Sequence, residues 1–347
     1  MRTTLGEGPV VAAPGKVFLV GEYAVLEGGT AVLAAVTRQA VGEFIPALEP
    51  ASPLVAEAVR VTLAALGDRA AALPTGSVRI DTGAFSAPGD GRGEGRKLGL
   101  GSSAATAACS VGAVLELAGL PVAAHRELAF SLAESAHRAW QGGLGSGADV
   151  AVAVHGGIVQ YSRPAGRAPV VRRQPNGLGG LELVVFSART AASTTRQIGA
   201  VRAFADRSPA HYASLLAAVR KAAERFVDAL AATRARDAIA AIRAAGESLE
   251  ALGQAADVAI VTPAFARAAA IAAELGGAAK PSGAGGGDVG VGLFIDRASA
   301  DAFAERLGRG AATGEAAGTA VDVLDLRVDD RGLHRRSAGI ARVEQHV

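Results

Sequence analysis

Short runs of apolar residues, broken by glycine and proline, open the chain. PVVAA and KVFLV lie on either side of Pro14-Gly15, and a longer run, TAVLAAVTRQAVGEF, follows Gly28-Gly29. Short apolar runs that are bounded by turn residues are typical of buried strands. The pattern therefore predicts that the chain begins with strands.

Apolar residues then recur at helical spacing. Residues 52–67 begin with a serine cap and end at a glycine, which predicts a helix. Further helices are predicted over 102–120 and 125–140. Short alternating segments between them predict strands, and these segments are SVRIDTG, GGIVQYS and LELVVFS. Residues 84–96 carry glycine, proline and charge without a period, which predicts a loop.

The pattern changes near residue 190. Long stretches rich in alanine, arginine and glutamate predict several helices between 195 and 275. DVGVGLFID and TAVDVLDLRV predict strands, with a helix between them in ASADAFAERLG, which suggests a small α+β sandwich. A chain of 347 residues is long enough for two domains. We expect these domains to cover residues 1–188 and 189–347.

Composition narrows the class of protein. The chain is 50% hydrophobic and 20% charged, with a formal net charge of +2, which is typical of a globular protein. This balance does not favour nucleic acid or membrane as a partner. No apolar run approaches the roughly 18 residues of a membrane span, and no signal-peptide pattern opens the chain. The single cysteine, Cys109, excludes an intramolecular disulfide, so we expect a cytoplasmic protein.

The segment KLGLGSSAA places glycine and serine at the start of an alanine-rich helix. The first N–H groups of a helix have no internal partner and lie at the positive end of its dipole. Glycine lets the backbone approach an anion, and serine can cap the helix or bind magnesium. Gly99, Leu100, Gly101, Ser102 and Ser103 are therefore a candidate phosphate cradle. The alternative is an ordinary capped helix after a loop.

Two other phosphate-binding motifs fit this chain less well. A Walker loop needs serine or threonine after its lysine, whereas valine follows Lys16. Gly99, Gly101 and Ala104 match the spacing of the dinucleotide fingerprint. That fingerprint should follow a hydrophobic strand, but the charged segment DGRGEGRK precedes it here.

Three further segments carry candidate chemistry. APGKVFLVGEYAVLEGG places Lys16 at the start of a strand, and QGGLGSGADVAVAV places Asp149 at the start of a helix. KPSGAGGGDVGVGLF has a glycine density that suggests close approach of the backbone to a ligand. The plain alternatives are a surface lysine, a helix cap and a tight interdomain turn.

Together and in this order, these segments resemble the motifs of the GHMP kinase superfamily, which includes galactokinase, homoserine kinase and mevalonate kinase. The first motif is APGKVFLVGEYAVLEGG, the second is KLGLGSSAA and the third is KPSGAGGGDVGVGLF. The resemblance spans residues 12–294. It implies a two-domain α+β fold, with an N-terminal ribosomal-S5-like α/β domain and a C-terminal ferredoxin-like α+β domain.

Within the superfamily, the chain is most similar to the phosphomevalonate kinases. Tyr23 stands where mevalonate kinases usually carry histidine, and Arg138 stands where they place a magnesium-binding glutamate. Glu134 is a candidate replacement for that glutamate. Val289 and the lack of a proline before the second motif depart from the pattern. The resemblance implies ATP-dependent phosphorylation of (R)-5-phosphomevalonate to 5-diphosphomevalonate in the mevalonate pathway, by a monomer or a homodimer.

The resemblance also implies roles for individual residues. Lys16 and Asp149 would face each other at the transferred phosphoryl group, and Ser103 would bind Mg²⁺. The residues expected to bind ATP are Lys97, Gly99, Leu100, Gly101, Ser102, Ser103 and Ala104. The residues expected to bind phosphomevalonate are Tyr23, Arg138, Ser146, Gly147, Ser193, Thr194, Arg196, Ser282, Gly283, Ala284 and Gly285. His137 and Arg189 are further candidate cations for the anionic acceptor.

Other functions stay open on the sequence alone. One is a mevalonate kinase or another small-alcohol kinase of the superfamily. Another is a non-catalytic sensor of ATP and a ligand, which predicts a damaged catalytic pair, whereas Lys16 and Asp149 are both present. A decarboxylase of the superfamily would lack the Lys16 pattern. An RNA-binding protein would need basic residues clustered on one face.

Overall fold

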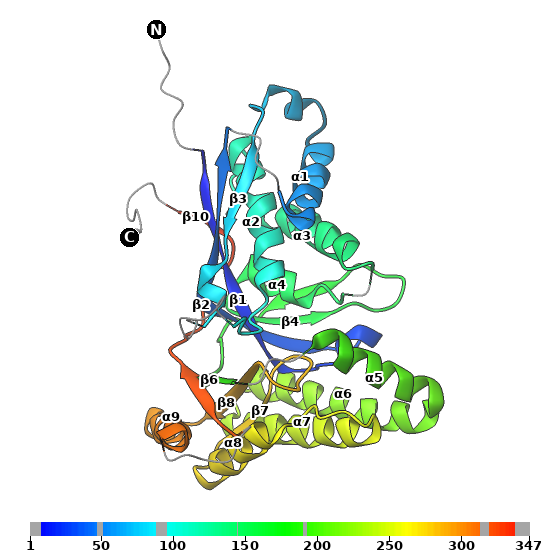
Figure 1. Ribbon diagram of the computed structural model, residues 1–347, viewed down its shortest axis with the longest axis vertical. Helices are drawn as coiled ribbons and strands as arrows, with labels where there is room; N and C mark the ends of the chain where they lie inside the picture. The colour runs from blue at the N-terminus through cyan, green and yellow to red at the C-terminus, as the bar shows by residue number, and fades with distance from the viewer. Residues whose placement is uncertain are drawn as a thin grey trace.

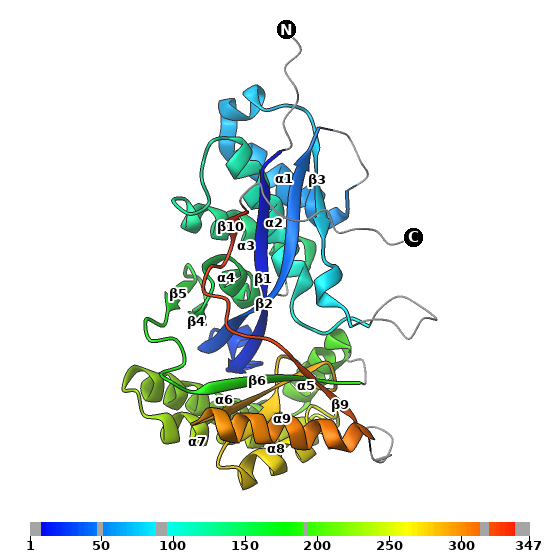
Figure 2. The same ribbon diagram turned by 90° about the vertical axis from the view of Figure 1, so that its left-hand side faces the viewer.

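The computed structural model describes residues 8–46, 51–87, 96–143, 145–189, 193–312 and 319–336. Two sheets with their helices lie one above the other, and the first sheet stands upright over the second (Figure 1, Figure 2). Within these ranges, no helix combines the length and the apolar character that crossing a bilayer requires.

An antiparallel sheet of six strands forms the first half of the fold. Its strands are β1 (Val10–Val20), β2 (Ala31–Ile45), β3 (Ser77–Asp81), β4 (Ile158–Ser162), β5 (Val170–Arg173) and β10 (His334–Arg335). They follow the order β10-β1-β2-β4-β5, and β3 also pairs with β2. The register between β1 and β2 shifts at Pro14/Gly15 and again at Phe18/Val20. Such irregularities bend a strand, and these two flank Lys16.

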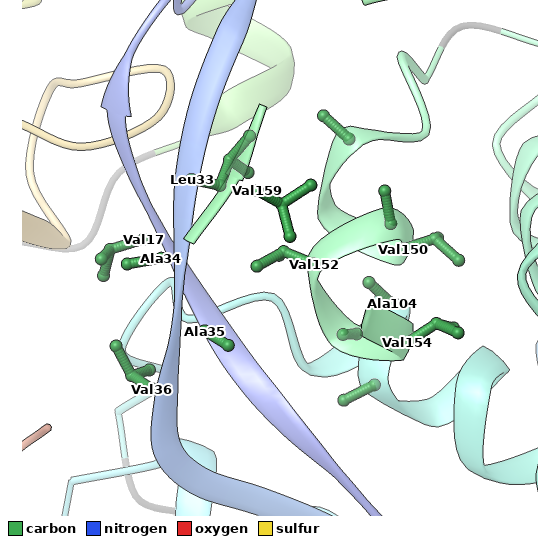
Figure 3. Close-up of a cluster of buried hydrophobic side chains, with 14 of the residues drawn as sticks. Val17, Leu33, Ala34, Ala35, Val36, Ala104, Val150, Val152, Val154 and Val159 are labelled. Carbon is green, nitrogen blue, oxygen red and sulfur yellow. The ribbon is translucent and has the colours of Figure 1, made fainter. Parts of the chain in front are cut away.

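Helices cover one face of this sheet (Figure 1). They are α1 (Pro53–Leu66), α2 (Ser102–Leu117), α3 (Arg126–Trp140) and α4 (Ala148–His155). Short 3-10 helices are η1 (Ala24–Glu27), η2 (Gly67–Ala72) and η3 (Gly83–Phe85). Figure 3 shows Val152 of α4 pointing toward Leu33 of β2 and Val159 of β4, whereas Val150 and Val154 project from the other side of the helix, and all five are buried. This packing fixes the start of α4, where Asp149 lies.

A smaller antiparallel sheet of four strands organises the second half of the fold. Its strands are β6 (Glu182–Ala188), β7 (Ala278–Pro281), β8 (Val289–Phe294) and β9 (Val321–Leu324), in the order β7-β8-β6-β9. Its helices are α5 (Thr194–Arg207), α6 (Pro209–Ala231), α7 (Ala235–Ala255), α8 (Pro263–Glu274) and α9 (Arg297–Ala312). The rings of Phe186, Phe265, Phe294 and Phe303 lie with neighbouring centroids 4.9 to 6.0 Å apart, and they join this sheet to α8 and α9.

One cluster of buried hydrophobic side chains spans the two halves. Phe226 of α6 and Ile242 of α7 belong to the same hydrophobic cluster as Val17 and Leu19 of β1. Because β1 is packed against both halves, the strand that carries Lys16 is held from two sides.

The sequence predicts a domain boundary after residue 188, and the pairing of the strands shows which sheet each segment joins. The strands expected in SVRIDTG, GGIVQYS and LELVVFS are confirmed as β3, β4 and β6. However, β6 precedes the predicted boundary and pairs with β8 and β9 in the second sheet. The chain later returns to the first sheet, where β10 pairs with β1. The domain limits stay a prediction, and the change of sheet occurs before Glu182.

Candidate active site

A cavity of about 940 Å³ opens between the starts of α2 and α4, helix α5 and the loop between β7 and β8. Each of the four segments that the sequence singled out supplies part of its wall. One lining residue from each segment, in chain order, is Lys16, Gly101, Asp149 and Gly285. Residues far apart in the chain therefore meet at one site.

Lys16 lies on β1 and is held against the start of α2. Its backbone N–H donates to the Leu100 carbonyl at 2.8 Å, and its Nζ donates to the Gly99 carbonyl at 3.3 Å. Burial lowers the pKa of Lys16, and nearby carboxylates, among them Asp149 and Asp288, oppose this shift. The amine therefore lies near carboxylates in a partly desolvated wall, where its charge acts strongly on an anion.

The loop before α2 has a backbone shaped to receive an anion. Gly99 and Gly101 have φ angles of 71° and 80°, in the left-handed region that favours glycine. A Cβ at Gly101 would lie 2.9 Å from Cε of Lys16, and one at Gly99 would lie 2.8 Å from Cβ of Asp288. Gly101 is also the N-cap of α2, and no side chain caps this helix. The first N–H groups of α2 are therefore left for a ligand.

Ser103, in the first turn of α2, is bonded to a buried histidine. Nε2 of His137 lies 3.0 Å from Oγ of Ser103, and His137 is 1% exposed. If the hydroxyl donates its proton to Nε2, the lone pairs of Ser103 stay available to another partner. His137 therefore supports Ser103 from behind, and it does not line the cavity itself.

Asp149 lies in the first turn of α4, on the cavity wall. Its Oδ1 accepts a hydrogen bond from the N–H of Val150 at 3.0 Å, which orients the carboxylate. The preceding loop is fixed by β4, because the hydroxyl of Tyr161 donates to the Ser146 carbonyl at 2.5 Å. The first sheet thus positions Asp149 as well as Lys16.

Glu134, the candidate replacement for a magnesium ligand, is paired with an arginine. Its Oε1 lies 2.5 Å from Nη2 of Arg163. A Cβ at Gly147 would lie 3.1 Å from the same oxygen, so the carboxylate packs beneath the loop that leads into α4. Glu134 does not line the cavity. This geometry argues against Glu134 as a ligand of a metal ion in the cavity.

The loop between β7 and β8 is bonded to the first glycine-rich segment. The N–H of Phe18 donates to Oγ of Ser282 at 2.7 Å, and the hydroxyl of Tyr23 donates to the Ala284 carbonyl at 2.6 Å. Burial and the neighbouring Glu22 raise the pKa of Tyr23, so its hydroxyl remains a donor. These bonds fix the loop as one wall of the cavity.

Family comparisons agree with this arrangement. The family model described as GHMP kinases N terminal domain matches residues 53–157, and the one described as GHMP kinases C terminal matches residues 226–312. Together the two models match more than half of the chain. The chain belongs to the GHMP kinase family. The predicted fold and the prediction that the chain is a kinase are both confirmed.

Individual relatives extend the comparison. The phosphomevalonate kinase of Streptomyces sp. (strain CL190) is 28% identical to this GHMP kinase, across 86% of this chain and 93% of the relative. A Lin0012 protein from Listeria innocua superposes with a TM-score of 0.79 at 23% identity, covering 95% of this chain and 99% of that one. Streptococcus pneumoniae phosphomevalonate kinase, solved with phosphomevalonate and AMPPNP, gives a TM-score of 0.74 at 22% identity, with 92% and 99% covered. At these identities, the two solved structures show a shared fold.

Most residues predicted to contact ligands line the cavity of this GHMP kinase. From the ATP set, these are Lys97, Gly99, Leu100, Gly101, Ser102 and Ser103. From the acceptor set, these are Tyr23, Ser146, Thr194, Ser282, Gly283, Ala284 and Gly285. Ala104 does not line the cavity, because its side chain is fully buried in the core.

Four residues predicted to bind the acceptor lie outside the cavity walls: Arg138, Gly147, Ser193 and Arg196. Oγ of Ser193 accepts a hydrogen bond from the N–H of Arg196 at 3.3 Å, so Ser193 caps α5. Gly147 is the N-cap of α4. Arg138 follows His137 on α3 and therefore points about 100° further round the helix. The binding roles of these four residues stay predictions.

Sequence reasoning missed one face of α5. The face consists of Thr195, Ile198, Gly199 and Arg202. These positions recur at i, i+3, i+4 and i+7, which places them on one side of a helix. That periodicity could have identified Arg202 as a cavity residue, because Thr194 beside it was already a candidate.

Two arginines near the cavity differ from expectation. Arg96, which ends a segment predicted only as a loop, lines the cavity, and its Nη1 donates to Oγ of Ser187 at 3.0 Å. Arg189, a predicted cation for the acceptor, lies 2.9 Å from the Asp322 carboxylate and does not line the cavity. A glycine-rich loop has no period from which the position of Arg96 could be deduced.

The side chains that line the cavity could supply some of the ligands of a metal ion, but not all of them. Within the part of the chain that the structure describes, no cluster of three or more histidine, cysteine, aspartate or glutamate side chains could hold a metal. Ser103, Asp149 and Asp288 nevertheless place oxygen atoms on the cavity wall. Mg²⁺ commonly takes one or two carboxylates together with water and phosphate oxygens. The site therefore fits a metal ion that arrives with a phosphate ligand.

Proposed function

We propose that this GHMP kinase transfers the γ-phosphoryl group of ATP to (R)-5-phosphomevalonate and forms 5-diphosphomevalonate and ADP. The observation that carries the proposal is the similarity to Streptomyces phosphomevalonate kinase, 28% identical across 86% of this chain. The cavity supports it, because anions of both substrates would meet cations and free N–H groups there.

The nucleotide would place its phosphates at the start of α2. The left-handed backbone at Gly99 and Gly101 is open to glycine, and the missing Cβ atoms let the side chains of Asp288 and Lys16 lie against this loop. Ser102 and Ser103 line the cavity in the first turn of α2, at a helix end without a side-chain cap, where their N–H groups would bind phosphate oxygens. Lys16 would supply a positive charge beside the same phosphates, because its Nζ lies 3.3 Å from the Gly99 carbonyl.

Magnesium, when bound with ATP, would neutralise charge on the phosphate chain. Ser103 is the candidate protein ligand, since His137 can accept its hydroxyl proton and leave its lone pairs free. Asp149 and Asp288 are the carboxylates on the same cavity wall.

Transfer would form one bond and break one. An oxygen of the acceptor phosphate attacks the γ-phosphorus, and the bond to the β–γ bridging oxygen breaks, so that ADP leaves with the electron pair. The attacking oxygen is already largely ionised near neutral pH, because a second phosphate pKa lies near 6. A strong base is therefore unnecessary. Asp149 would orient Lys16 and the acceptor, and Lys16 would stabilise charge on the equatorial oxygens.

An acceptor with a phosphate and a carboxylate needs a cationic pocket. Arg96, Lys97 and Arg202 line the cavity in addition to Lys16. Because Arg138 replaces the acidic residue expected of mevalonate kinases, the region also has one carboxylate fewer. Both features favour an acceptor with a phosphate and a carboxylate over one with a carboxylate alone.

The test is a panel of acceptors with purified protein and magnesium-ATP. ADP release is followed in a coupled assay with phosphomevalonate, with mevalonate and without acceptor. We expect kcat/KM for phosphomevalonate to exceed that for mevalonate by about 100-fold or more, because a site built to bind a polar group rejects the analogue that lacks it. Phosphorus NMR of the product should show a diphosphate.

Two results would contradict the proposal. A higher kcat/KM with mevalonate would identify a mevalonate kinase. ATP binding without turnover of any acceptor would favour the sensor.

A further inference from the structure

An ion pair between Lys280 and Glu22 lies at the edge of the cavity and is almost fully buried. Lys280, on β7, is 1% exposed, and Glu22, which follows β1, is 2% exposed. Nζ of Lys280 binds Oε1 of Glu22 and also donates to the Pro281 carbonyl at 2.6 Å. The pair therefore ties the end of β1 to the start of the loop between β7 and β8.

Stability alone is a weak explanation for this pair. Two buried charges lose solvation, and well-packed hydrophobic residues are often at least as stabilising. Oε2 of Glu22 is buried without a hydrogen-bond partner, so the carboxylate is not fully satisfied. Lysine is also rare in this chain and occurs only at Lys16, Lys97, Lys221 and Lys280. Position 280 therefore carries a compact ammonium group in a chain whose cationic residues are mostly arginine.

The pair is one of three hydrogen bonds made by side chains between the same two segments, among the residues that the structure describes. The others are the bond from Phe18 N–H to Ser282 at 2.7 Å and the bond from the Tyr23 hydroxyl to the Ala284 carbonyl at 2.6 Å. Both segments line the cavity, and Glu22 itself contributes to its wall. The three contacts therefore fix the distance across one corner of the cavity.

This corner includes Lys16. Lys16 and Phe18 are two residues apart on β1 and both line the cavity, as strand alternation allows. Nζ of Lys16 lies 5.4 Å from the centroid of the Phe18 ring. A shift of Phe18 relative to Ser282 would therefore move the lysine that faces the phosphates.

We propose that the Glu22–Lys280 pair is a positioning device that holds Lys16 in register with the loop between β7 and β8. This inference rests on the proposed role of Lys16 in phosphoryl transfer. Neither member of the pair needs to touch substrate, since each acts through the strand or loop that carries it.

The variants that test it are Lys280→Met, Glu22→Gln and the double variant Glu22→Gln/Lys280→Met. Each single variant leaves one buried group without its partner, whereas the double variant leaves no buried charge. Lys221→Met, at an exposed position on α6, is the matched control. Ser282→Ala removes the neighbouring contact without exposing a charge.

We expect kcat to fall about 100-fold in Lys280→Met, the effect of a small misplacement of a reacting group, with KM for ATP within about threefold. The double variant should regain thermal stability while its kcat stays low. Ser282→Ala should lower kcat by about 10-fold, since one of three contacts is lost. A purely structural role predicts the opposite, because kcat would recover together with stability.

A second readout does not depend on turnover. Amide hydrogen exchange at Phe18 should become faster in the single and double variants and remain unchanged in Lys221→Met. Unchanged exchange at Phe18 in every pair variant, or recovery of kcat in the double variant, would overturn the inference. If the wild-type protein does not use phosphomevalonate, the proposed function fails, but the exchange measurement still tests the pair.

Discussion

Helices α1 and α2 begin in opposite ways, although they pack against each other on the same side of the first sheet (Figure 1). α1 follows Ser52, whose Oγ accepts a hydrogen bond from the N–H of Val55 at 3.4 Å. Pro53 occupies its first position, where the missing N–H has no consequence. α2 follows Gly101 and has no side-chain cap. The first helix satisfies its own N-terminus, and the second presents it to the cavity.

The contrast extends to two other helices near the site. α4 begins after Gly147, at a φ of 88° and without a side-chain cap, and it carries Asp149. α5 begins after Ser193, which caps it. A serine-type cap stabilises a helix by about 1 kcal/mol. The N-cap glycines of α2 and α4 supply none, although Oγ of Ser146 accepts a hydrogen bond from the first N–H of α4 at 3.3 Å. Of these four helices, the two that begin at a glycine in the left-handed region are α2 and α4, and both begin at the cavity.

The largest expected effect comes from removing the charge that faces the start of α2. Lys16→Met should reduce kcat about 1000-fold, because a preorganised group that stabilises transition-state charge is lost. Folding should be retained, since burial already disfavours the charged lysine and lowers its pKa. Steady-state kinetics and circular dichroism measure the two effects. A kcat within tenfold of wild type would remove Lys16 from the mechanism.

The second-largest effect is expected at the N-terminal end of α2, and its control lies beyond the C-terminal end. Gly101→Ala should lower kcat/KM for ATP about 100-fold, because its Cβ would displace Lys16, 2.9 Å away. Gly119→Ala, beyond the other end of the helix, is a matched control. Its φ is also positive, at 72°, but a Cβ there meets nothing within 4 Å.

The control should therefore lose only about 1 kcal/mol of stability from backbone strain and keep its kinetic constants. Kinetics and denaturant unfolding of both variants separate the two causes. Equal kinetic losses in Gly101→Ala and Gly119→Ala would mean that backbone strain, not the cradle, explains the result.

A smaller effect is expected at the start of α4. Asp149→Asn should reduce kcat about 30-fold, less than Lys16→Met, because an ionised phosphate acceptor needs orientation more than proton removal. The comparison uses kcat for both variants at saturating substrates. Complete loss of activity in folded Asp149→Asn would instead assign this carboxylate a role in proton transfer.

The elements with strong local signals could be predicted from the sequence, and those defined by distant partners could not. The helix of residues 52–67 was predicted because it combines a cap, a period and a terminal glycine. β7 was missed, because AAKP has no alternation and becomes a strand only by pairing with β8. β5 is similarly short and pairs with β4. In both strands, pairing with a neighbouring strand outweighs the intrinsic conformational preference of the residues.

The candidate site shows the same limit. The glycine-rich segments identified most of the cavity wall, because glycine density reports a backbone requirement that is local. The partner of a polar side chain is not local, and the sequence did not reveal it. Ser193 caps α5, and the hydroxyl of Tyr23 is bonded to the Ala284 carbonyl. Residue type suggested chemistry at both positions, but the fold determines which atom each hydroxyl meets.

The smallest expected effect tests the comparison of α1 with α2 most directly. Ser52→Ala should lower the free energy of unfolding by about 1 kcal/mol and leave kinetic constants unchanged, because it removes a cap that does not line the cavity. Ser102→Ala should leave stability within about 0.5 kcal/mol, since Ser102 caps nothing. It should raise KM for ATP about fivefold, the value of one lost hydrogen bond. Urea unfolding and ATP titrations of both variants give the four values. If Ser102→Ala destabilises the protein as Ser52→Ala does and KM for ATP is unchanged, the start of α2 is an ordinary helix end, and phosphate must bind elsewhere.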